Sequence, residues 1–241
     1  DGGVQRVASL LSKIYLELGW DVHVITVYDK IKYPKSGSYF TLHFDNFSAS
    51  NLLKNIKSFL NLRGYMKINN FDLIIDLRAR MRLIPELLIY LFAIPLKKTI
   101  FTYHLPLINH YIPEPIFMSR YFYNHAYANV AVSNSICELL VANKISNTTV
   151  IHNPVDHDLI LSRSTEKLNI SFDYIVGSGR MNDNIKQFDQ LISAYCKSTL
   201  PEENIHLILL GDGLLKSDLK ANIQNEFKSK IHFMGFVENP F

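Results

Sequence analysis

Residues 176–195 read VGSGRMNDNIKQFDQLISAY, and this stretch already indicates a fold class. It starts at the end of an apolar run, 172–176, that predicts a buried strand. A turn with two glycines follows, and apolar residues then recur at helical spacing over 185–198. A strand that passes through a glycine turn into a helix is the repeating unit of parallel α/β sheets. We therefore expect an α/β protein.

The same alternation continues on both sides of this stretch. Downstream we expect strands at 205–210 and 231–234 and a helix at 214–227. Upstream, helices are expected at 4–18, 51–62, 83–92, 113–125 and 133–143, the last capped by Ser133, and strands at 22–27, 40–44, 71–76, 98–103, 127–132 and 148–152. Such alternation predicts parallel, doubly wound sheets covered on both faces.

The pattern is interrupted once, between residues 153 and 169, where Pro, Asp, His and Ser dominate. This composition is typical of a linker between domains. We expect two Rossmann-like domains, residues 1–160 and 161–241. Because the chain opens inside a glycine turn without a methionine, we expect the first strand of the first domain to be missing and the second domain to be incomplete.

Composition narrows the class of protein. Of the 241 residues, 48% are hydrophobic and 20% are charged, which excludes a disordered chain, and a net charge of +3 is too weak to indicate nucleic-acid binding. Cys137 and Cys196 form no metal or disulfide pattern, so reduced thiols in the cytoplasm are expected. No paired-acid metal site is visible, and we expect neither a metal nor another cofactor.

The most apolar segment, residues 83–96, is too short to cross a bilayer and is bracketed by Pro85 and Pro95. Two interpretations remain open for it. It is either a buried helix of an α/β layer or a membrane-facing patch with Lys97 and Lys98 beside it.

Ligands of open α/β sheets bind at the carboxyl ends of the strands, so the loops there are the candidate sites. Arg180 follows the Gly177-Ser178-Gly179 turn, and Lys186 comes six residues later. Two cations at this position are suited to a diphosphate and to the negative charge that grows on a departing nucleotide. The alternative is a pair of solvated surface cations.

Three further places in the sequence carry candidate residues. Gly2 and Gly3 precede a helix, where free N–H groups favour a phosphate, although such a turn is also ordinary connection chemistry. Gly211-Asp212-Gly213 follows a strand and would allow close backbone approach to a nucleotide, or Asp212 simply caps the next helix. His104 ends a strand, where it is either a satisfied structural residue or a hydrogen-bond partner of a sugar hydroxyl.

Taken together, these stretches resemble the GT-B glycosyltransferases of family 4, a retaining group that includes many bacterial lipopolysaccharide and capsule enzymes. The stretches that match, in the order of the family, are GGVQRV from Gly2, VAVSNSICELL from Val130, VIHNPVD from Val150, VGSGRMNDNIKQFDQLISAY from Val176, LILLGDGLL from Leu207 and IHFMGFVENPF from Ile231.

The resemblance implies a site between two domains that face a cleft. Gly3 would lie by the donor phosphates, His104 near the transferred sugar, and Arg180 and Lys186 on the diphosphate. The donor-binding set would be Gly2, Gly3, Gly179, Arg180, Lys186, Gly211, Asp212 and Gly213, with Asn153 and Asp156 shaping the crossing between domains. The implied activity is transfer of a sugar from a nucleotide diphosphate sugar to a glycan or lipid-linked acceptor, in the cytoplasm or peripherally at the inner face of the membrane.

Two departures from the family pattern affect this interpretation. The family more often separates its Arg and Lys by one residue fewer than Arg180 and Lys186 are separated here. Its glutamate pair normally lies beyond residue 241, so we expect the chain as given to be inactive. Alternatives are a GT-B-shaped sugar-nucleotide epimerase, a non-catalytic nucleotide or glycan-binding module, and a dinucleotide-binding oxidoreductase, although Gly177-Ser178-Gly179 lacks the third glycine of the G-x-G-x-x-G pattern.

Overall fold

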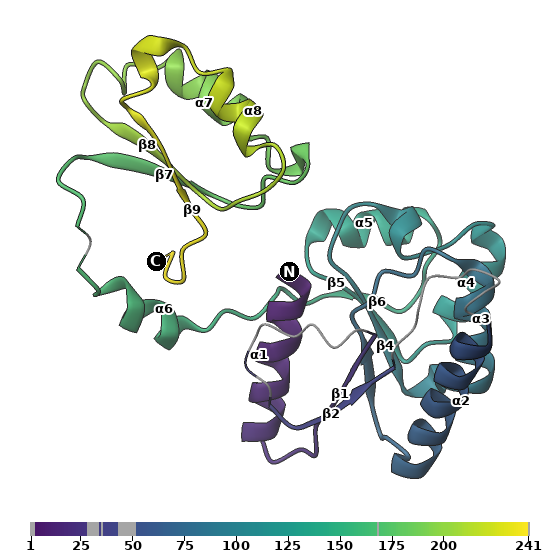
Figure 1. The fold of residues 1–241 in the computed structure, drawn as a ribbon. Coiled ribbons are helices and arrows are strands. Elements are labelled where there is room, and N and C mark those ends of the chain that lie inside the picture. Colours follow the sequence, from purple (N-terminus) through teal and green to yellow (C-terminus); the bar gives the residue numbers. More distant parts are fainter. Residues whose placement is uncertain (1–2, 28–33, 35, 43–51, 168, 241) are drawn as a thin grey trace. The chain divides into compact units, whose positions relative to one another are not determined.

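A computed structural model describes residues 3–27, 34, 36–42, 52–167 and 169–240 (Figure 1). The chain divides into two compact units, Asp1–Val155 (unit 1) and Asp156–Phe241 (unit 2). Every strand pair among the described residues is parallel, which confirms the expected α/β class. The sequence-based boundary at 160/161 lies within a helix of unit 2.

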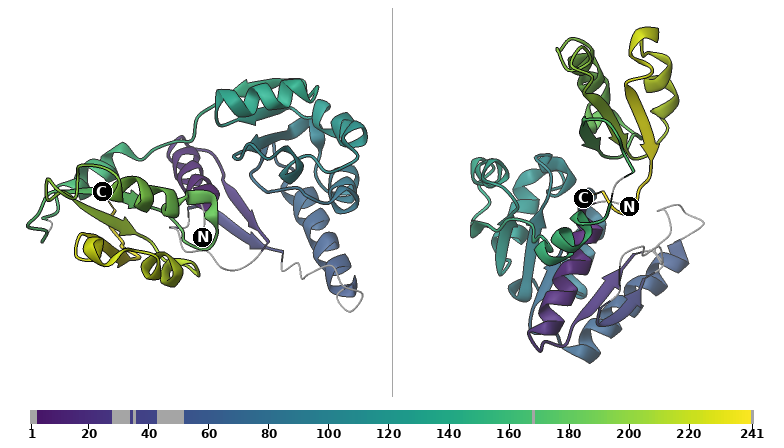
Figure 2. Two further views of the ribbon diagram at one scale, coloured as in Figure 1. Left: turned by 90° about the horizontal axis from the view of Figure 1, so that it is seen from above. Right: turned by 90° about the vertical axis from the view of Figure 1, so that its left-hand side faces the viewer.

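Unit 1 alternates helices and strands as the sequence predicts. Its helices are α1 (Gly3–Glu17), α2 (Leu52–Asn69), α3 (Leu83–Phe92), α4 (Ile116–Asn124) and α5 (Asn134–Ala142), and its strands are β1 (His23–Thr26), β2 (Ser38–Thr41), β3 (Ile74–Asp76), β4 (Thr99–Tyr103), β5 (Ala128–Ala131) and β6 (Thr148–Val150). The strands form a β1–β2 pair and a sheet in the order β3-β4-β5-β6. Helix α1 lies alongside the β1–β2 pair (Figures 1 and 2).

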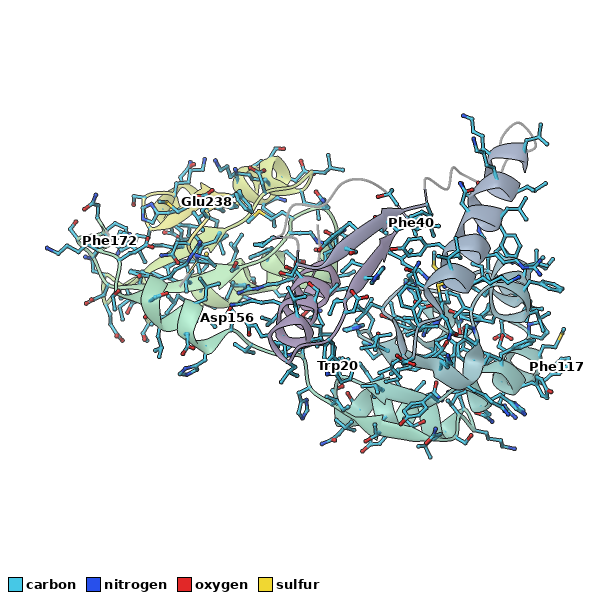
Figure 3. All side chains as sticks on the ribbon, turned by 90° about the horizontal axis from the view of Figure 1, so that it is seen from below. Trp20, Phe40, Phe117, Asp156, Phe172 and Glu238 are labelled. Atoms are coloured by element: carbon cyan, nitrogen blue, oxygen red, sulfur yellow. The ribbon has the colours of Figure 1, made fainter. Side chains whose placement is uncertain are left out.

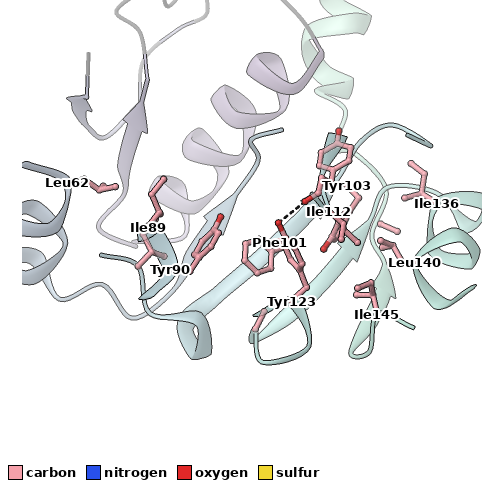
Figure 4. Close-up of a cluster of buried hydrophobic side chains, with 14 of the residues drawn as sticks. Leu62, Ile89, Tyr90, Phe101, Tyr103, Ile112, Tyr123, Ile136, Leu140 and Ile145 are labelled. Carbon is pink, nitrogen blue, oxygen red and sulfur yellow. Dashed lines mark hydrogen bonds between the residues drawn. The ribbon is translucent and has the colours of Figure 1, made fainter. Parts of the chain in front are cut away.

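One hydrophobic core packs against both sheets of unit 1. Leu42, directly after β2, is buried in the same cluster as Phe101 on β4 and Ile136 on α5. Aromatic rings occupy its centre, where Phe101 contacts both Tyr90 and Tyr123 edge to face (Figure 4). The β1–β2 pair is therefore part of one unit with the four-stranded sheet, although no ladder hydrogen bond between described strands joins them.

Local sequence signals explain where several helices begin and end. The Ser133 hydroxyl accepts a hydrogen bond from the backbone N–H of Ile136 at 3.4 Å and so caps α5 as expected. Helix α3 has the predicted bounds, and it is buried on one face only. It buries Glu86, Ile89 and Tyr90 and exposes an aliphatic stripe, Ile84, Leu88 and Leu91.

Unit 2 contains α6 (His157–Ser164), β7 (Tyr174–Ser178), α7 (Phe188–Cys196), β8 (His206–Leu210), α8 (Lys216–Ala221) and β9 (Ile231–Gly235), with sheet order β7-β8-β9 (Figure 2). Its core packs Phe188, Ile192 and Tyr195 of α7 against Leu207 and Leu209 of β8. The core is small, and Met181 from the loop at the carboxyl end of β7 is part of it.

Three predicted segments of unit 2 differ from the structure. Helix α6 occupies part of the expected linker, and its N-cap is Asp156, whose carboxylate accepts a hydrogen bond from Leu159 N at 3.0 Å (Figure 3). The segment expected to be helical over 214–227 is helical only in α8 and in a short 3₁₀ turn, Asn225–Phe227, because Gln224 has an extended backbone. Helix α7 starts three residues later than predicted because Gln187 adopts a left-handed conformation.

Among the helices that the structure describes, none combines the length and the apolar character needed to cross a membrane.

Candidate functional site

The carboxyl ends of β7, β8 and β9 form one edge of unit 2, and their loops are tied together by backbone hydrogen bonds. Gly179 N donates to Leu210 O at 3.0 Å, and Met181 N donates to Asp212 O at 3.0 Å. The Met181 side chain is fully buried in the core beneath this edge. The loop after β7 is therefore anchored on both sides of Arg180.

The glycines after β8 are required by the close packing of these loops. Gly211 has φ +126° and Gly213 has φ +158°, in the left-handed region that favours glycine. A Cβ atom at Gly211 would lie 1.9 Å from the carbonyl oxygen of Gly179, and one at Gly213 would lie 2.3 Å from the carbonyl carbon of Met181. Loop packing within the protein therefore accounts for both residues.

Arg180 and Lys186 lie at this edge, and both are exposed. The aliphatic stem of Lys186 packs over Gly179, with its Cγ 3.0 Å from where a Cβ of that glycine would be, so the lysine is held beside the loop that carries Arg180. Within the described part of the chain, neither side chain has a hydrogen bond or an ion pair. Both cations are thus available to a ligand with negative charge.

Asp212 interacts with a lysine that the sequence did not single out. Its carboxylate accepts hydrogen bonds from Lys216 Nζ at 3.0 Å and from Gly213 N at 2.9 Å. These two bonds, the one from Lys216 first, lower the pKa of Asp212. The alternative that Asp212 caps the next helix is wrong, because α8 begins at Lys216 without a side-chain cap. The spacing of four residues between Asp212 and Lys216 was the sequence signal that could have predicted this ion pair.

Gly2 lies outside the described residues, and Gly3 is the first residue of α1 in unit 1. Gly3 is exposed, and a Cβ atom built on it would have no described atom within 4 Å. Packing therefore does not require glycine at this position, in contrast to Gly211 and Gly213.

His104 follows β4 at the carboxyl edge of the unit 1 sheet. Its ring Nε2 is 3.0 Å from the hydroxyl of Thr102, and its backbone N–H donates to the Tyr111 hydroxyl at 3.1 Å. Burial and the charge of Arg80 lower the pKa of His104, and the side chain of Asn153, near the ring, opposes them in part. At neutral pH this histidine is therefore uncharged.

The end of β3 and the residues after it form a buried charged network that the sequence analysis missed. The carboxylate of Asp76 accepts hydrogen bonds from Arg78 Nη2 at 2.8 Å and from the Tyr90 hydroxyl. Arg78 also donates to Glu86 on α3 at 3.0 Å. Burial alone would raise the pKa of Asp76, but the charges of Arg78 and Arg80 outweigh it and hold that pKa well below its usual value.

Arg80 is the largest fully buried side chain among the described residues. Its guanidinium lies 4.7–5.5 Å from the ring centroids of four aromatic residues, Phe101, Tyr103, Tyr111 and Tyr123. It donates to the carbonyls of Asp76 at 3.3 Å, Arg78 at 2.9 Å and Thr102 at 3.3 Å. The D-x-R-x-R spacing that begins at Asp76, the last residue of β3, was the only sequence signal for this network.

The structure thus gathers the predicted residues into two groups, each within its own unit. Unit 2 brings together Gly179, Arg180, Lys186 and Gly211-Asp212-Gly213, and unit 1 brings Asn153 near His104. Asp156 caps α6. In the described part of the chain, no group of three or more His, Cys, Asp or Glu side chains is placed to hold a metal ion.

Comparisons with known proteins point to one family. The profile of Glycosyltransferase Family 4 matches residues 1–159. Among solved structures, the chain is similar to the lipopolysaccharide outer core galactosyltransferase WaaB in its apo form (TM-score 0.63, 17% identity, 99% of this chain and 66% of that chain). It is equally similar to HepE from Anabaena in complex with UDP and glucose (TM-score 0.63, 17% identity, 99% and 67%).

WaaG, a glycosyltransferase involved in lipopolysaccharide biosynthesis, is also similar (TM-score 0.57, 11% identity, 98% of this chain and 67% of that chain). At these identities the likeness shows a common fold, that of the GT-B glycosyltransferases. The chain spans about two thirds of the length of these three structures. A search of curated proteins returned no significant match.

Proposed function

Since the chain belongs to glycosyltransferase family 4, we propose that the protein transfers a sugar from a nucleotide diphosphate sugar to a hydroxyl of a glycan or lipid-linked acceptor, with retention of the anomeric configuration. Retention is the outcome typical of the family that the sequence resembles. The similarity to WaaB and WaaG, which act on lipopolysaccharide by their names, supports a role in making lipopolysaccharide or another cell-surface polysaccharide.

The observation that carries this proposal is the pair of exposed cations at the carboxyl edge of unit 2. Arg180 presents a planar fork of donors, which matches two phosphate oxygens, and Lys186 adds a compact charge. Both would neutralise the charge that develops on the departing nucleotide diphosphate as the bond to the sugar breaks. We propose that these two residues do so without a metal ion.

The remaining candidates are assigned around this diphosphate. Gly179, Gly211, Asp212 and Gly213 would contact the donor on the unit 2 side, because a glycine without a side chain lets a ligand come close to the backbone. Gly2 and Gly3 would lie by the donor phosphates, where the first N–H groups of α1 point outward. His104 would contact the transferred sugar. The complex of HepE with UDP and glucose supports a nucleotide sugar as donor.

The test uses the protein from its complete reading frame, incubated with pooled UDP-, GDP- and ADP-sugars and a panel of glycan and lipid-linked acceptors. We expect nucleotide release that depends on an acceptor, persists in EDTA and yields a retained linkage by NMR. Release of an epimerised sugar without an acceptor would instead identify an epimerase. Binding of a nucleotide sugar without any turnover would identify a binding module and overturn the transferase proposal.

We also propose that unit 1 contacts the inner face of a membrane through the outer faces of α2 and α3, which lie side by side (Figure 1). At helical spacing, one face of α2 carries three exposed aliphatic residues, Leu53, Ile56 and Leu60, together with Lys57, Arg63 and Lys67. On α3 the stripe Ile84, Leu88 and Leu91 is also exposed, and Phe117 on α4 projects outward (Figure 3).

Charge complementarity favours an anionic lipid surface as the occupant of this face. Helix α2 carries four cations and no carboxylate, and the one acid of α3, Glu86, is buried against Arg78. Exposed aliphatic side chains with lysine and arginine beside them allow both apolar contact and electrostatic attraction to an anionic membrane interface. A location in the cytoplasm, peripheral to the membrane, would follow.

Reversing charge on α2 is expected to weaken binding to anionic vesicles. Each Lys or Arg near an anionic surface contributes about 1 kcal/mol, so the double variant Arg63→Glu, Lys67→Glu should lose roughly tenfold or more in affinity. The measurement is co-sedimentation with phosphatidylglycerol–phosphatidylcholine vesicles, and Lys197→Glu, Lys228→Glu in unit 2 is the matched control. Equal binding to pure phosphatidylcholine, or no loss in the α2 variant, would contradict the proposal.

A further inference from the structure

A pocket of about 260 Å³ lies at the amino edge of the unit 1 sheet, where α2 and α3 end. Its lining comes from the last turns of α2, the start of β3, the end of α3 and the 3₁₀ turn Leu96–Lys98 that leads into β4. Ile74 in this lining is the first residue of β3 and pairs with Thr99, the first residue of β4. His104 follows the other end of β4, so the pocket is separate from the candidate sugar site.

Three cations and no carboxylate line this pocket. Arg63 and Lys67 lie one turn apart on α2, and within the described part of the chain neither has a hydrogen bond or an ion pair. Lys98 Nζ donates to the carbonyl of Phe71 at 2.9 Å and to the side-chain oxygen of Asn70 at 3.4 Å, which are both neutral groups. No described acid therefore compensates these three charges, and the pocket attracts an anion.

The ends of α2 and α3 do not account for all three cations. The carboxyl end of a helix carries about half an elementary negative charge and favours a cation within the last turn. Lys67 lies in the last turn of α2, but Arg63 lies before it. Two such partial charges also leave most of three full positive charges uncompensated. The positive charge of the pocket thus exceeds what the two helix ends require.

Apolar side chains form much of the remaining lining, which makes the pocket a poor match for a bare inorganic anion. Met66 is buried, Phe71 and Ile74 are partly buried, and Phe92 is 54% exposed. A small hydrated anion would leave this apolar surface in contact with water, whereas an anion joined to aliphatic carbons would cover it. The chemistry of the pocket therefore matches an amphiphile with a negatively charged head.

The same two helices supply this pocket and the exposed aliphatic residues proposed above to contact a membrane. Arg63 and Lys67 belong to both sets, and the exposed Leu91 on α3 directly precedes Phe92 of the pocket lining. A lipid of the bilayer that these helices contact is therefore the nearest source of an anionic amphiphile.

We propose that the pocket binds the phosphate headgroup of one anionic glycerophospholipid. Arg63, Lys67 and Lys98 contact the phosphate, and the glycerol and the first acyl carbons cover Phe71 and Phe92. The lipid as the source of the phosphate rests on the proposed membrane contact, whereas the anion site rests on the pocket itself. One bound lipid holds unit 1 at a defined point, which the diffuse attraction of α2 to an anionic surface does not do.

The test adds dihexanoylphosphatidylglycerol, below the concentration at which it forms micelles, to the protein from its complete reading frame. We expect saturable binding of one lipid per chain by isothermal titration calorimetry. Dihexanoylphosphatidylcholine, whose headgroup has no net charge, and glycerophosphoglycerol, which has the same phosphate but no acyl chains, should each bind at least about tenfold more weakly. Equal binding of the phosphatidylcholine would overturn the anion site, and equal binding of glycerophosphoglycerol would overturn the lipid as its occupant.

Lys98 separates the pocket from the general charge of α2, since it is the one cation of the described lining that lies outside that helix. Lys98→Gln should weaken the binding of dihexanoylphosphatidylglycerol roughly tenfold, which corresponds to one hydrogen bond to a charged group. Lys97→Gln is the matched control and should bind like the wild type, because Lys97 is an exposed neighbour that does not line the pocket. Unchanged affinity in Lys98→Gln, or an equal loss in both variants, would contradict the proposal.

A variant that keeps every charge provides a second test, because Lys98 also holds the end of α2 through Phe71 and Asn70. Ala93→Leu lengthens a side chain of the pocket lining at the end of α3 and should abolish the saturable binding of the short-chain lipid. The melting temperature of each variant checks that it is folded. Wild-type affinity in a folded Ala93→Leu variant would place the lipid elsewhere and overturn the site.

Vesicle binding separates a failure of this site from a failure of the membrane contact. A protein that binds the short-chain lipid but does not sediment with phosphatidylglycerol–phosphatidylcholine vesicles would refute the membrane contact and leave the pocket in place. Sedimentation with those vesicles without saturable binding of the short-chain lipid would do the reverse. Neither measurement needs a sugar nucleotide, so both are independent of the transferase proposal.

Discussion

Replacing Arg180 with alanine is expected to lower kcat/KM for sugar transfer by roughly 10²–10³-fold, the range seen when one group that stabilises transition-state charge is removed. Arg180 is exposed at the carboxyl edge of unit 2 and has no hydrogen bond or ion pair among the described residues, so its loss removes little that holds the fold together. The change should fall on the chemical step and leave the melting temperature near that of the wild type. The measurement is nucleotide release with and without acceptor.

Two further variants sharpen this experiment. Arg180→Lys keeps the charge but loses the planar fork, so we expect an intermediate rate. Lys197→Ala removes a cation of the same unit at the far end of α7 and should have no effect. Wild-type kcat/KM in Arg180→Ala would show that the diphosphate is bound elsewhere and would remove the main support for the proposed donor site.

Removing the carboxylate of Asp76 is expected to destabilise unit 1 by about 3–5 kcal/mol, because breaking a buried ion pair leaves an uncompensated buried charge. Asp76 is 5% exposed, and its carboxylate lies 3.7 Å from Nη1 of Arg80, whose side chain is fully buried. The measurement is urea unfolding of Asp76→Ala followed by fluorescence of Trp20, the only tryptophan, which lies in unit 1. Fluorescence therefore reports on this unit.

The control for this variant is Asp72→Ala, which removes an exposed carboxylate four residues earlier and should change stability by less than about 0.5 kcal/mol. If Asp76→Ala unfolds at the same urea concentration as the wild type, the buried network contributes nothing to stability. Asp76→Asn, which keeps the size of the side chain, separates the loss of charge from the loss of packing.

The pH dependence of the Asp76 contribution follows from the direction of its pKa shift. Burial would raise this pKa, but Arg78 and Arg80 hold it below the value of about 3.9 expected in the unfolded chain. A carboxyl whose pKa is lowered by folding stabilises the protein fully above its unfolded pKa and loses that contribution as pH falls through the folded pKa. The free energy of unfolding of the wild type should therefore exceed that of Asp76→Ala by a smaller amount as the pH falls below about 4.

Sequence periodicity predicted most of the elements because the signals for a helix or a strand lie within a few residues of one another. The bounds of α3, the cap of α5 by Ser133 and the strand–turn–helix order around Gly179 and Gly211 all match. Periodicity did not predict a helix that buries few of its side chains. Helix α6 contains no buried residue, so its sequence has no strong apolar face, and only its Asp156 cap indicates a helix start.

The α/β class, the order of the elements and the loops that carry Arg180, Lys186, His104 and the paired glycines could all be predicted from local sequence patterns. The tertiary structure alone decided that Arg80 and Glu86 are buried and that α3 turns aliphatic side chains outward. It alone also joined Thr102 to the Asp76 carbonyl, 26 residues away in the chain. A local pattern assigns charge to the surface and apolar residues to the core. Only the packing of distant segments supplies the partners that make a buried charge stable or leave an apolar face uncovered.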